Sequence, residues 1–133
     1  MVPDQPLAVQ VDGWLHVLQI STVVEWDVLV FLHRHGTLLV KAETIALLVG
    51  YDKDPVGKTL DNLVSLGLVR RSRSSQGVRF YRFDVPLNSA IERSTEQLLK
   101  LSAERTGRLI ITRRLVVRAQ HFQVPARGGL GLA

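Results

Sequence analysis

Between positions 22 and 66, apolar residues recur every three or four positions, the spacing that gathers them on one face of a helix. This pattern predicts helices at residues 22–35, 42–49 and 55–66. Thr22 and Glu25 have capping-box spacing at the start of the first helix, and Asp54 followed by Pro55 favours the start of the third. Each predicted helix is followed by a glycine, the residue that best adopts a left-handed end: Gly36, Gly50 and Gly67.

After residue 67 the pattern changes to short runs of β-favouring residues. The runs 68–73 and 78–83 favour strands, and the polar loop Ser74–Gly77 between them indicates a β-hairpin. Pro86 ends this hairpin. The sequence therefore predicts a mainly α fold with a small β-hairpin, an α+β class.

A helical extension is predicted beyond the hairpin. Ser89 and Glu92 form a second capping box, which starts a fourth helix that runs to about residue 105. Gly107 either ends or bends that helix. The apolar run 109–117 is too short for its period to distinguish a helix from a strand.

The two ends of the chain have weaker patterns. Residues 1–21, which contain two early prolines, are expected to form an N-terminal arm or a short strand. Residues 119–133 are rich in glycine and are expected to form a flexible tail. Between them lie a folded domain at 22–84 and the helical extension at 88–118.

Composition agrees with one globular domain, because 46% of the 133 residues are hydrophobic. The longest stretch without a charged residue, Gly13–Val24, is well short of the ~20 residues that a membrane-spanning helix needs. No Lys or Arg precedes Arg34, so the start lacks the basic segment of a secretory signal. With no cysteine in the sequence, we expect a cytoplasmic protein that binds no membrane.

Neither a cofactor nor a metal is predicted. His33 and His35 are two positions apart, so on a helix their rings would point ~200° apart. The sequence has no cysteine and only two other histidines, so it does not offer the usual four ligands of a metal site. No nucleophile and base occur at the spacing of a known catalytic motif, so we do not expect the chain to be an enzyme.

The charge is unevenly placed along the chain. The net charge of +5 is the sum of −4 over residues 1–69, +4 over 70–84 and +5 over 85–133. A localised basic segment favours a polyanionic partner such as nucleic acid. A solvated surface rich in arginine is the alternative explanation of the same charge.

The order of helix, helix, tight turn, helix and basic hairpin over residues 23–83 resembles a winged helix-turn-helix. The residues that carry the resemblance are Ala42 through Gly50, Val56, Lys58, Leu60, Leu63 and Gly67 through Val69. They are similar to bacterial winged-helix regulators of the MarR-like group. The resemblance implies a transcription regulator that binds double-stranded DNA, with helix 55–66 as the recognition helix and residues 70–82 as the wing.

A recognition helix reads base edges in the major groove through its exposed face. Leu60 and Leu63 are expected in the core, which leaves the opposite face exposed: Gly57, Lys58, Asp61 and Asn62. Lys58 could reach a phosphate or a guanine, and Asn62 could pair with an adenine. The wing is expected to contact the DNA backbone or the minor groove through Arg70, Arg71, Arg73, Ser74, Ser75, Gln76 and Arg79.

The predicted recognition helix is itself slightly acidic, because Asp54 and Asp61 outnumber Lys58. Such a helix adds little to the neutralisation of phosphates that dominates affinity for DNA. The alternative function is therefore a winged helix that docks a protein partner through helix 55–66. Steeply salt-dependent binding to duplex DNA would distinguish the first function from the second.

The apolar residues of the C-terminal third exceed what one small winged domain can bury. Ile91, Leu98 and Leu101 line the fourth helix, and the run 109–117 adds more. An apolar surplus of this kind usually meets a partner. The surplus and the family resemblance together predict a homodimer, with Ile91, Leu98 and Leu101 as dimerisation residues.

Overall fold

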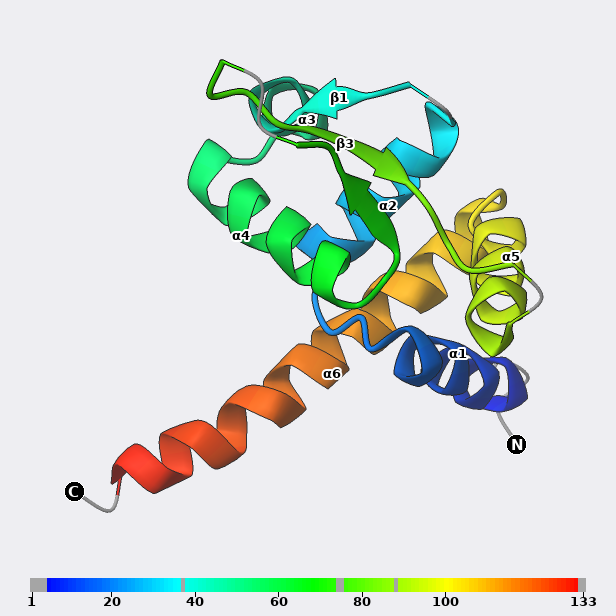
Figure 1. Ribbon diagram of the computed structural model, residues 1–133. Helices are drawn as coiled ribbons and strands as arrows, with labels where there is room; N and C mark the ends of the chain where they lie inside the picture. Colours follow the sequence, from blue (N-terminus) through cyan, green and yellow to red (C-terminus); the bar gives the residue numbers. More distant parts are fainter. Residues whose placement is uncertain (1–4, 37, 74–75, 88, 132–133) are drawn as a thin grey trace. The chain divides into compact units, whose positions relative to one another are not determined.

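Helices and a three-stranded antiparallel sheet make up the computed structural model, which confirms the predicted α+β fold class (Figure 1). The structure describes residues 5–36, 38–73, 76–87 and 89–131. The chain divides into two units, which we describe one at a time. Residues 24–93 are called the winged unit, and residues 1–23 together with 94–133 are called the helical unit.

The winged unit has the element order of a winged helix-turn-helix. Its elements are α2 (Val23–Arg34), β1 (Val40–Lys41), α3 (Ala42–Val49), α4 (Lys53–Ser65), β2 (Val69–Arg71) and β3 (Phe80–Phe83). The strand β3 lies between β1 and β2 and is antiparallel to both. Tyr81 is at the centre of this sheet, since it lies opposite Val40 on one side and Arg71 on the other.

Glycines end α3 and α4 as the sequence predicted. Gly50 and Gly67 have φ angles of 83° and 80°, in the left-handed region that residues with a Cβ avoid. After α4, the N–H of Gly67 donates to the carbonyl of Val64 and that of Leu68 to the carbonyl of Leu63, each at 3.0 Å. This pair of bonds is a Schellman motif, and it turns the chain directly into β2.

The predicted start of α4 at Pro55 is wrong by two residues. The helix begins at Lys53, and the carbonyl of Asp52 accepts the first helical bond from Val56 at 3.2 Å. Pro55 then lies in the first turn, where backbone N–H groups have no partner within the helix and a missing N–H costs little. The predicted register of the buried face is unaffected by this shift.

The strand β1 was not predicted. Only Val40 and Lys41 belong to it, and their pairing partners Tyr81 and Phe80 are about forty residues further along the chain. A strand this short has no alternation that a sequence pattern could show. The hairpin itself is confirmed, with Val69 opposite Phe83 in the register of β2 and β3.

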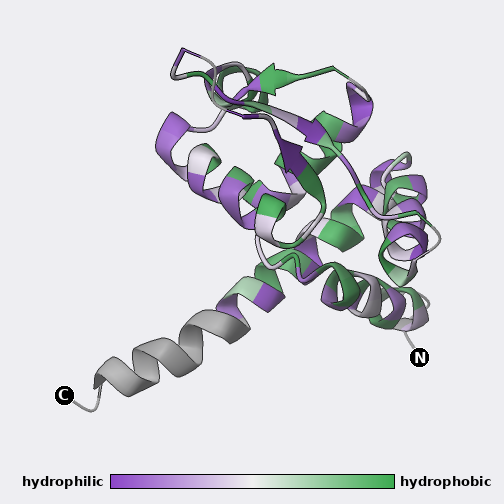
Figure 2. Ribbon diagram, viewed as in Figure 1, coloured by the Kyte–Doolittle hydropathy of each residue, from purple (hydrophilic) through white to green (hydrophobic). Residues whose placement is uncertain are grey.

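Buried residues of the winged unit come from every one of its helices and from the hairpin. They are Trp26, Val28, Leu29, Leu32, Ile45, Ala46, Val56, Leu60, Leu63, Leu68, Val69 and Tyr81. On α4 they recur at positions 56, 60 and 63, so one side of the helix is apolar and the other polar (Figure 2). The polar side of α4 is therefore available to a partner.

The helical unit contains α1 (Gln5–Leu18), most of α5 (Ala90–Leu101) and α6 (Arg105–Gly131). The predicted N-terminal arm or strand at 1–21 is wrong, because α1 buries Val11, Leu15 and Leu18 at helical spacing. Pro6 is compatible with this helix because it lies in the first turn. Among the described residues no single helix is long and apolar enough to cross a membrane, although Pro6–Leu18 and Val23–Arg34 reach that length and composition as a bent pair.

The predicted flexible tail at 119–133 is wrong as far as residue 131, since α6 continues to Gly131. The apolar run 109–117, which the pattern left open, is also helical. Adding a residue to an existing helix forms one hydrogen bond per residue fixed, so propagation is easier than a new start. The fourth helix ends at Leu101 rather than near residue 105, and Gly107 lies in the first turns of α6.

Leu98 is 0% exposed, so its predicted place on a dimer surface is wrong. Its side chain belongs to the core of the chain itself, because α5 packs with that face inward. Ile91 and Leu101 are half-buried. Among the side chains of α6 that the structure describes, the exposed apolar ones are Leu109, Val116 and Val117.

Several arginines of the helical unit stabilise its own structure. Arg114 makes a bidentate interaction with the carboxylate of Asp12: its Nε donates to Oδ1 at 2.8 Å and its Nη2 donates to Oδ2 at 2.9 Å. The side-chain hydrogen bond to Asp12 raises the pKa of Arg114, with burial acting against it. Arg118 donates to the carbonyl of Ile20 at 2.7 Å, and Arg108 donates to the carbonyls of Ser102 and Ala103. Three of the basic residues in 85–133, Arg108, Arg114 and Arg118, therefore bond within the structure of the chain itself.

Candidate nucleic-acid interface

The exposed face of α4 is the one that the sequence predicted. Lys58, Asp61 and Asn62 are exposed, and Gly57 is half-buried. Leu60 and Leu63 on the opposite side are 0% exposed. The face of α4 that would enter a DNA groove therefore carries one cation, one carboxylate and one amide.

Asn62 has a structural partner that the sequence did not reveal. Its side-chain amide donates to the carboxylate of Glu25 on α2, and Glu25 is only 8% exposed. A buried carboxylate is costly without hydrogen-bond donors, so this bond stabilises the packing of α4 against α2. The predicted pairing of Asn62 with an adenine would require its amide nitrogen to leave Glu25.

Two wing arginines are paired with carboxylates. Arg71 donates to Asp61 on α4 at 3.1 Å, and Arg70 donates to Asp84 at 3.1 Å. The side chain of Arg70 is 65% exposed and that of Asp61 is 63% exposed. Exposed pairs of this kind contribute only ~0–1 kcal/mol, so a phosphate can replace either carboxylate at little cost.

The remaining wing residues are more available. Arg73, Gln76 and Arg79 are exposed, and within the described part of the chain neither arginine has an ion pair. Gln76 and Gly77 have φ angles of 54° and 77°, so both adopt the left-handed backbone of a tight hairpin turn. The predicted contacts Ser74 and Ser75 lie outside the described residues.

A second bond holds the turn between α3 and α4 to α2. The hydroxyl of Tyr51 donates to the carboxylate of Asp27 at 2.6 Å. This hydrogen bond, with smaller contributions from burial and from the charge of Asp27, raises the pKa of Tyr51 from 10.0 to about 12. Together, Tyr51–Asp27 and Asn62–Glu25 fix the turn and the C-terminal part of α4 to α2.

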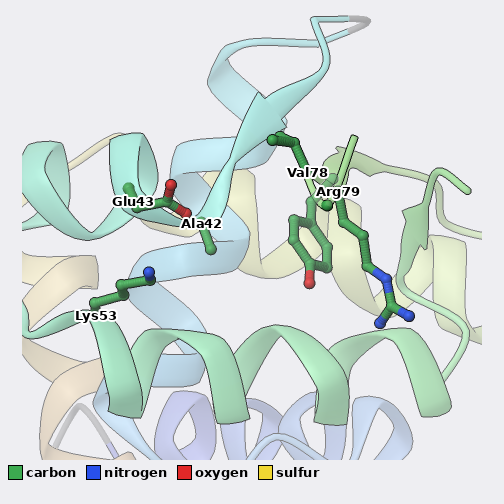
Figure 3. Close-up of a pocket in the computed structure, with 7 residues that line it drawn as sticks. Ala42, Glu43, Lys53, Val78 and Arg79 are labelled. Atoms are coloured by element: carbon green, nitrogen blue, oxygen red, sulfur yellow. The ribbon is translucent and has the colours of Figure 1, made fainter. Parts of the chain in front are cut away.

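A cavity of about 440 Å³ lies between the wing and the start of the helix-turn-helix (Figure 3). We call it the wing cavity, and it is lined by Ala42, Glu43, Lys53, Gly77, Val78, Arg79 and Tyr81. In Figure 3, Lys53 and Arg79 lie toward opposite ends of the space above α4, with Glu43 on the Lys53 side. The sequence alone did not predict that these residues line one cavity.

The histidines near the end of α2 contact aromatic rings. The ring of His33 lies 5.1 Å from that of Phe83, and the ring of His35 lies 4.2 Å from that of Phe31. Among the described residues, no three side chains of the metal-binding types come together. The absence of a metal or cofactor stays a prediction.

Comparisons with known proteins agree with this geometry in one respect. The MarR family model matches residues 20–79, which extend from just before α2 to Arg79 in the wing. No curated protein gives a match. Among solved structures, the chain is similar to the crystal structure of RV1404 from Mycobacterium tuberculosis, with 17% identity, a TM-score of 0.45, and coverage of 95% of this chain and 72% of that chain.

Proposed function

We propose that this chain is a DNA-binding winged helix-turn-helix regulator, because the MarR family model matches its residues 20–79. The family is one of DNA-binding transcription regulators rather than enzymes. In the proposed complex, α4 enters the major groove, and the β2–β3 hairpin lies on the DNA backbone or in the adjacent minor groove. Docking of a protein partner through α4 gains no support from the family match. We also propose a cytoplasmic location, where such a regulator meets DNA.

One observation carries this mode of binding. The exposed face of α4 and the basic hairpin are joined directly, because Arg71 of β2 reaches Asp61 of α4. Lys58 on the same helix is exposed, as are Arg73 and Arg79 on the wing. A helix fits the major groove, and arginines of a neighbouring ribbon can neutralise the phosphates that border it.

Fluorescence anisotropy with a mixed-sequence duplex at low salt tests the role of α4. We expect Lys58→Ala to weaken binding about three- to tenfold, because one phosphate or base contact is lost. Arg113→Ala is the matched control, since it removes an exposed cation of α6 and should leave affinity unchanged. Equal effects of the two substitutions would contradict the proposed role of α4, and no duplex binding at all would overturn the function.

We propose a homodimer whose contacts come from exposed apolar residues of α1 and α6. Val9 on α1 is 68% exposed, and Leu109, Val116 and Val117 on α6 are 49%, 45% and 46% exposed. Leu109 and Val116 are seven positions apart and therefore share one helix face. Two-fold symmetry would let two winged units bind a pseudo-palindromic site.

Light scattering at micromolar concentration tests the dimer. We expect twice the chain mass for the native protein and a shift toward the monomer mass for Val116→Glu, which places a charge in the proposed interface. Leu47→Glu is the control, because Leu47 is 80% exposed on α3 of the winged unit. A native mass equal to one chain would overturn the proposed dimer without affecting the proposed role of α4.

A further inference from the structure

We propose that the wing cavity is a phosphate-binding site. The proposal rests on the proposed DNA binding and names the group that the cavity would hold: one phosphate of the DNA backbone. Two of its proposed ligands, Lys53 and Tyr81, were not part of the predicted interface, whereas the third, Arg79, was.

The first ligand of the proposed site is the hydroxyl of Tyr81. This residue lines the cavity and is 6% exposed, at the centre of the sheet. No hydrogen bond of its hydroxyl is found within the described residues, and this oxygen is open to solvent rather than enclosed. An unpartnered hydroxyl at a cavity is a donor that favours a ligand with acceptor oxygens.

The two cations come from different elements. Lys53 is the first residue of α4, and Arg79 precedes β3 on the wing. Both are exposed and both line the cavity, and Figure 3 shows them on either side of it. An ammonium and a guanidinium are the groups that proteins use most for phosphate oxygens.

Two helices also begin at the cavity. Ala42 and Glu43 open α3, and Lys53 opens α4, which has 13 residues. The residues that precede these helices, Lys41 and Asp52, make no side-chain bond to the N–H groups of the first turn. Backbone N–H groups at a helix start are donors that favour an anion.

The carboxylate of Glu43 limits the charge that the cavity can accept. With Lys53 and Arg79 it leaves a net charge of about +1, which matches the single negative charge of a backbone phosphodiester. The location is also suitable for a DNA strand. When a helix occupies the major groove and a ribbon the adjacent minor groove, the strand that separates the grooves passes between the two elements.

Titration of the full chain with dimethyl phosphate, followed by amide NMR, tests the site directly. Inorganic phosphate serves as a second probe, and sodium chloride at the same ionic strength is the reference. We expect saturable shifts at Ala42, Glu43 and Lys53 with the phosphate probes alone. Shifts that chloride reproduces would overturn the proposal.

Two variants that each remove a hydroxyl test the contribution of Tyr81. Tyr81→Phe removes only the hydroxyl and should weaken phosphate binding about tenfold. Ser102→Ala is the control, because it removes a hydroxyl of the helical unit that does not line the cavity, and it should bind phosphate as the native chain does. Equal binding by the Tyr81 variant and the native chain would show that the hydroxyl is no ligand and would contradict the site.

Duplex binding then identifies the source of the phosphate. If the cavity holds a backbone phosphate, Lys53→Gln should lower the slope of log K against log salt concentration by about 0.9. An unchanged slope with phosphate titration intact would instead assign the cavity to a free phosphate compound and exclude the DNA strand. Loss of all duplex binding in the native chain would overturn the proposed function, while the phosphate titration would still decide the site.

Discussion

At the scale of single residues, two carboxylates of α2 hold the helix-turn-helix in position. Glu25 accepts the amide of Asn62, and Asp27 accepts the hydroxyl of Tyr51. Both partners come from the part of the chain that would contact DNA. These bonds therefore fix the angle at which α4 leaves the turn, and they connect the stability of the unit to its recognition surface.

The raised pKa of Tyr51 predicts a specific pH dependence. The folded value of about 12 exceeds the usual 10.0, so the stabilisation is complete below pH 10 and is lost as the pH rises through 12. We expect Tyr51→Phe to be less stable than the native chain by about 1 kcal/mol at pH 7, with the difference disappearing between pH 10 and 12. Urea unfolding across this range measures it, and a difference that stays constant to pH 12 would contradict the role of Asp27.

Asp61 predicts an increase in affinity when it is neutralised. Its carboxylate holds Arg71 and also repels phosphates, so Asp61→Asn should tighten duplex binding about three- to tenfold at low salt. Anisotropy measures this change. Glu96→Gln is the control, because Glu96 is an exposed residue of α5 outside the winged unit. Weaker binding by Asp61→Asn would mean that the carboxylate itself contacts DNA, for example at a cytosine.

At the scale of elements, the agreement between sequence and structure depends on how local the signal is. The helices α3 and α4 and the hairpin were predictable, because apolar spacing and the glycines at 50 and 67 determine them locally. The helix α1 was not predicted, because Pro6 and Gly13 are residues that disfavour a helix. In the structure its buried residues nevertheless recur at helical spacing. The strand β1 exists only through its pairing with Tyr81 and Phe80.

In the candidate site, too, the features set by local sequence were predictable and those set by long-range packing were not. Exposure of Lys58 and Asp61 followed from the helical period of α4 alone. The bond from Asn62 to Glu25 joins residues 37 positions apart, and the wing cavity joins the starts of two helices to β3. No local sequence pattern predicts these long-range contacts, because they depend on how the helices and strands pack.

The junction of α5 and α6 gives a test of packing at the same scale. A Cβ at Gly107 would lie 2.0 Å from the backbone oxygen of Leu101, so Gly107→Ala should destabilise the fold by about 2 kcal/mol or more. Gly13→Ala in α1 is the matched control, because a Cβ there meets nothing within 4 Å. We expect it to stabilise the protein by about 0.5–1 kcal/mol. Equal melting temperatures for the two variants would contradict the close contact.

At the scale of the whole molecule, the structure changes the meaning of the net charge of +5. The C-terminal arginines at 108, 114 and 118 bond to carbonyls or to Asp12, so they contribute less to a nucleic-acid surface than the sequence suggested. The wing keeps Arg73 and Arg79 exposed, and its two ion pairs are weak ones. Attraction for DNA should therefore come from the wing.

The most direct measurement is the salt dependence of duplex binding for two sets of variants. Replacing Arg71, Arg73 and Arg79 together with Ala should lower the slope of log K against log salt concentration by about 2–3. Replacing the exposed Arg105 and Arg113 of α6 should leave it near the native value. If the wing variant keeps the native slope, or if the α6 variant loses as much, the claim that this wing binds the DNA backbone is wrong.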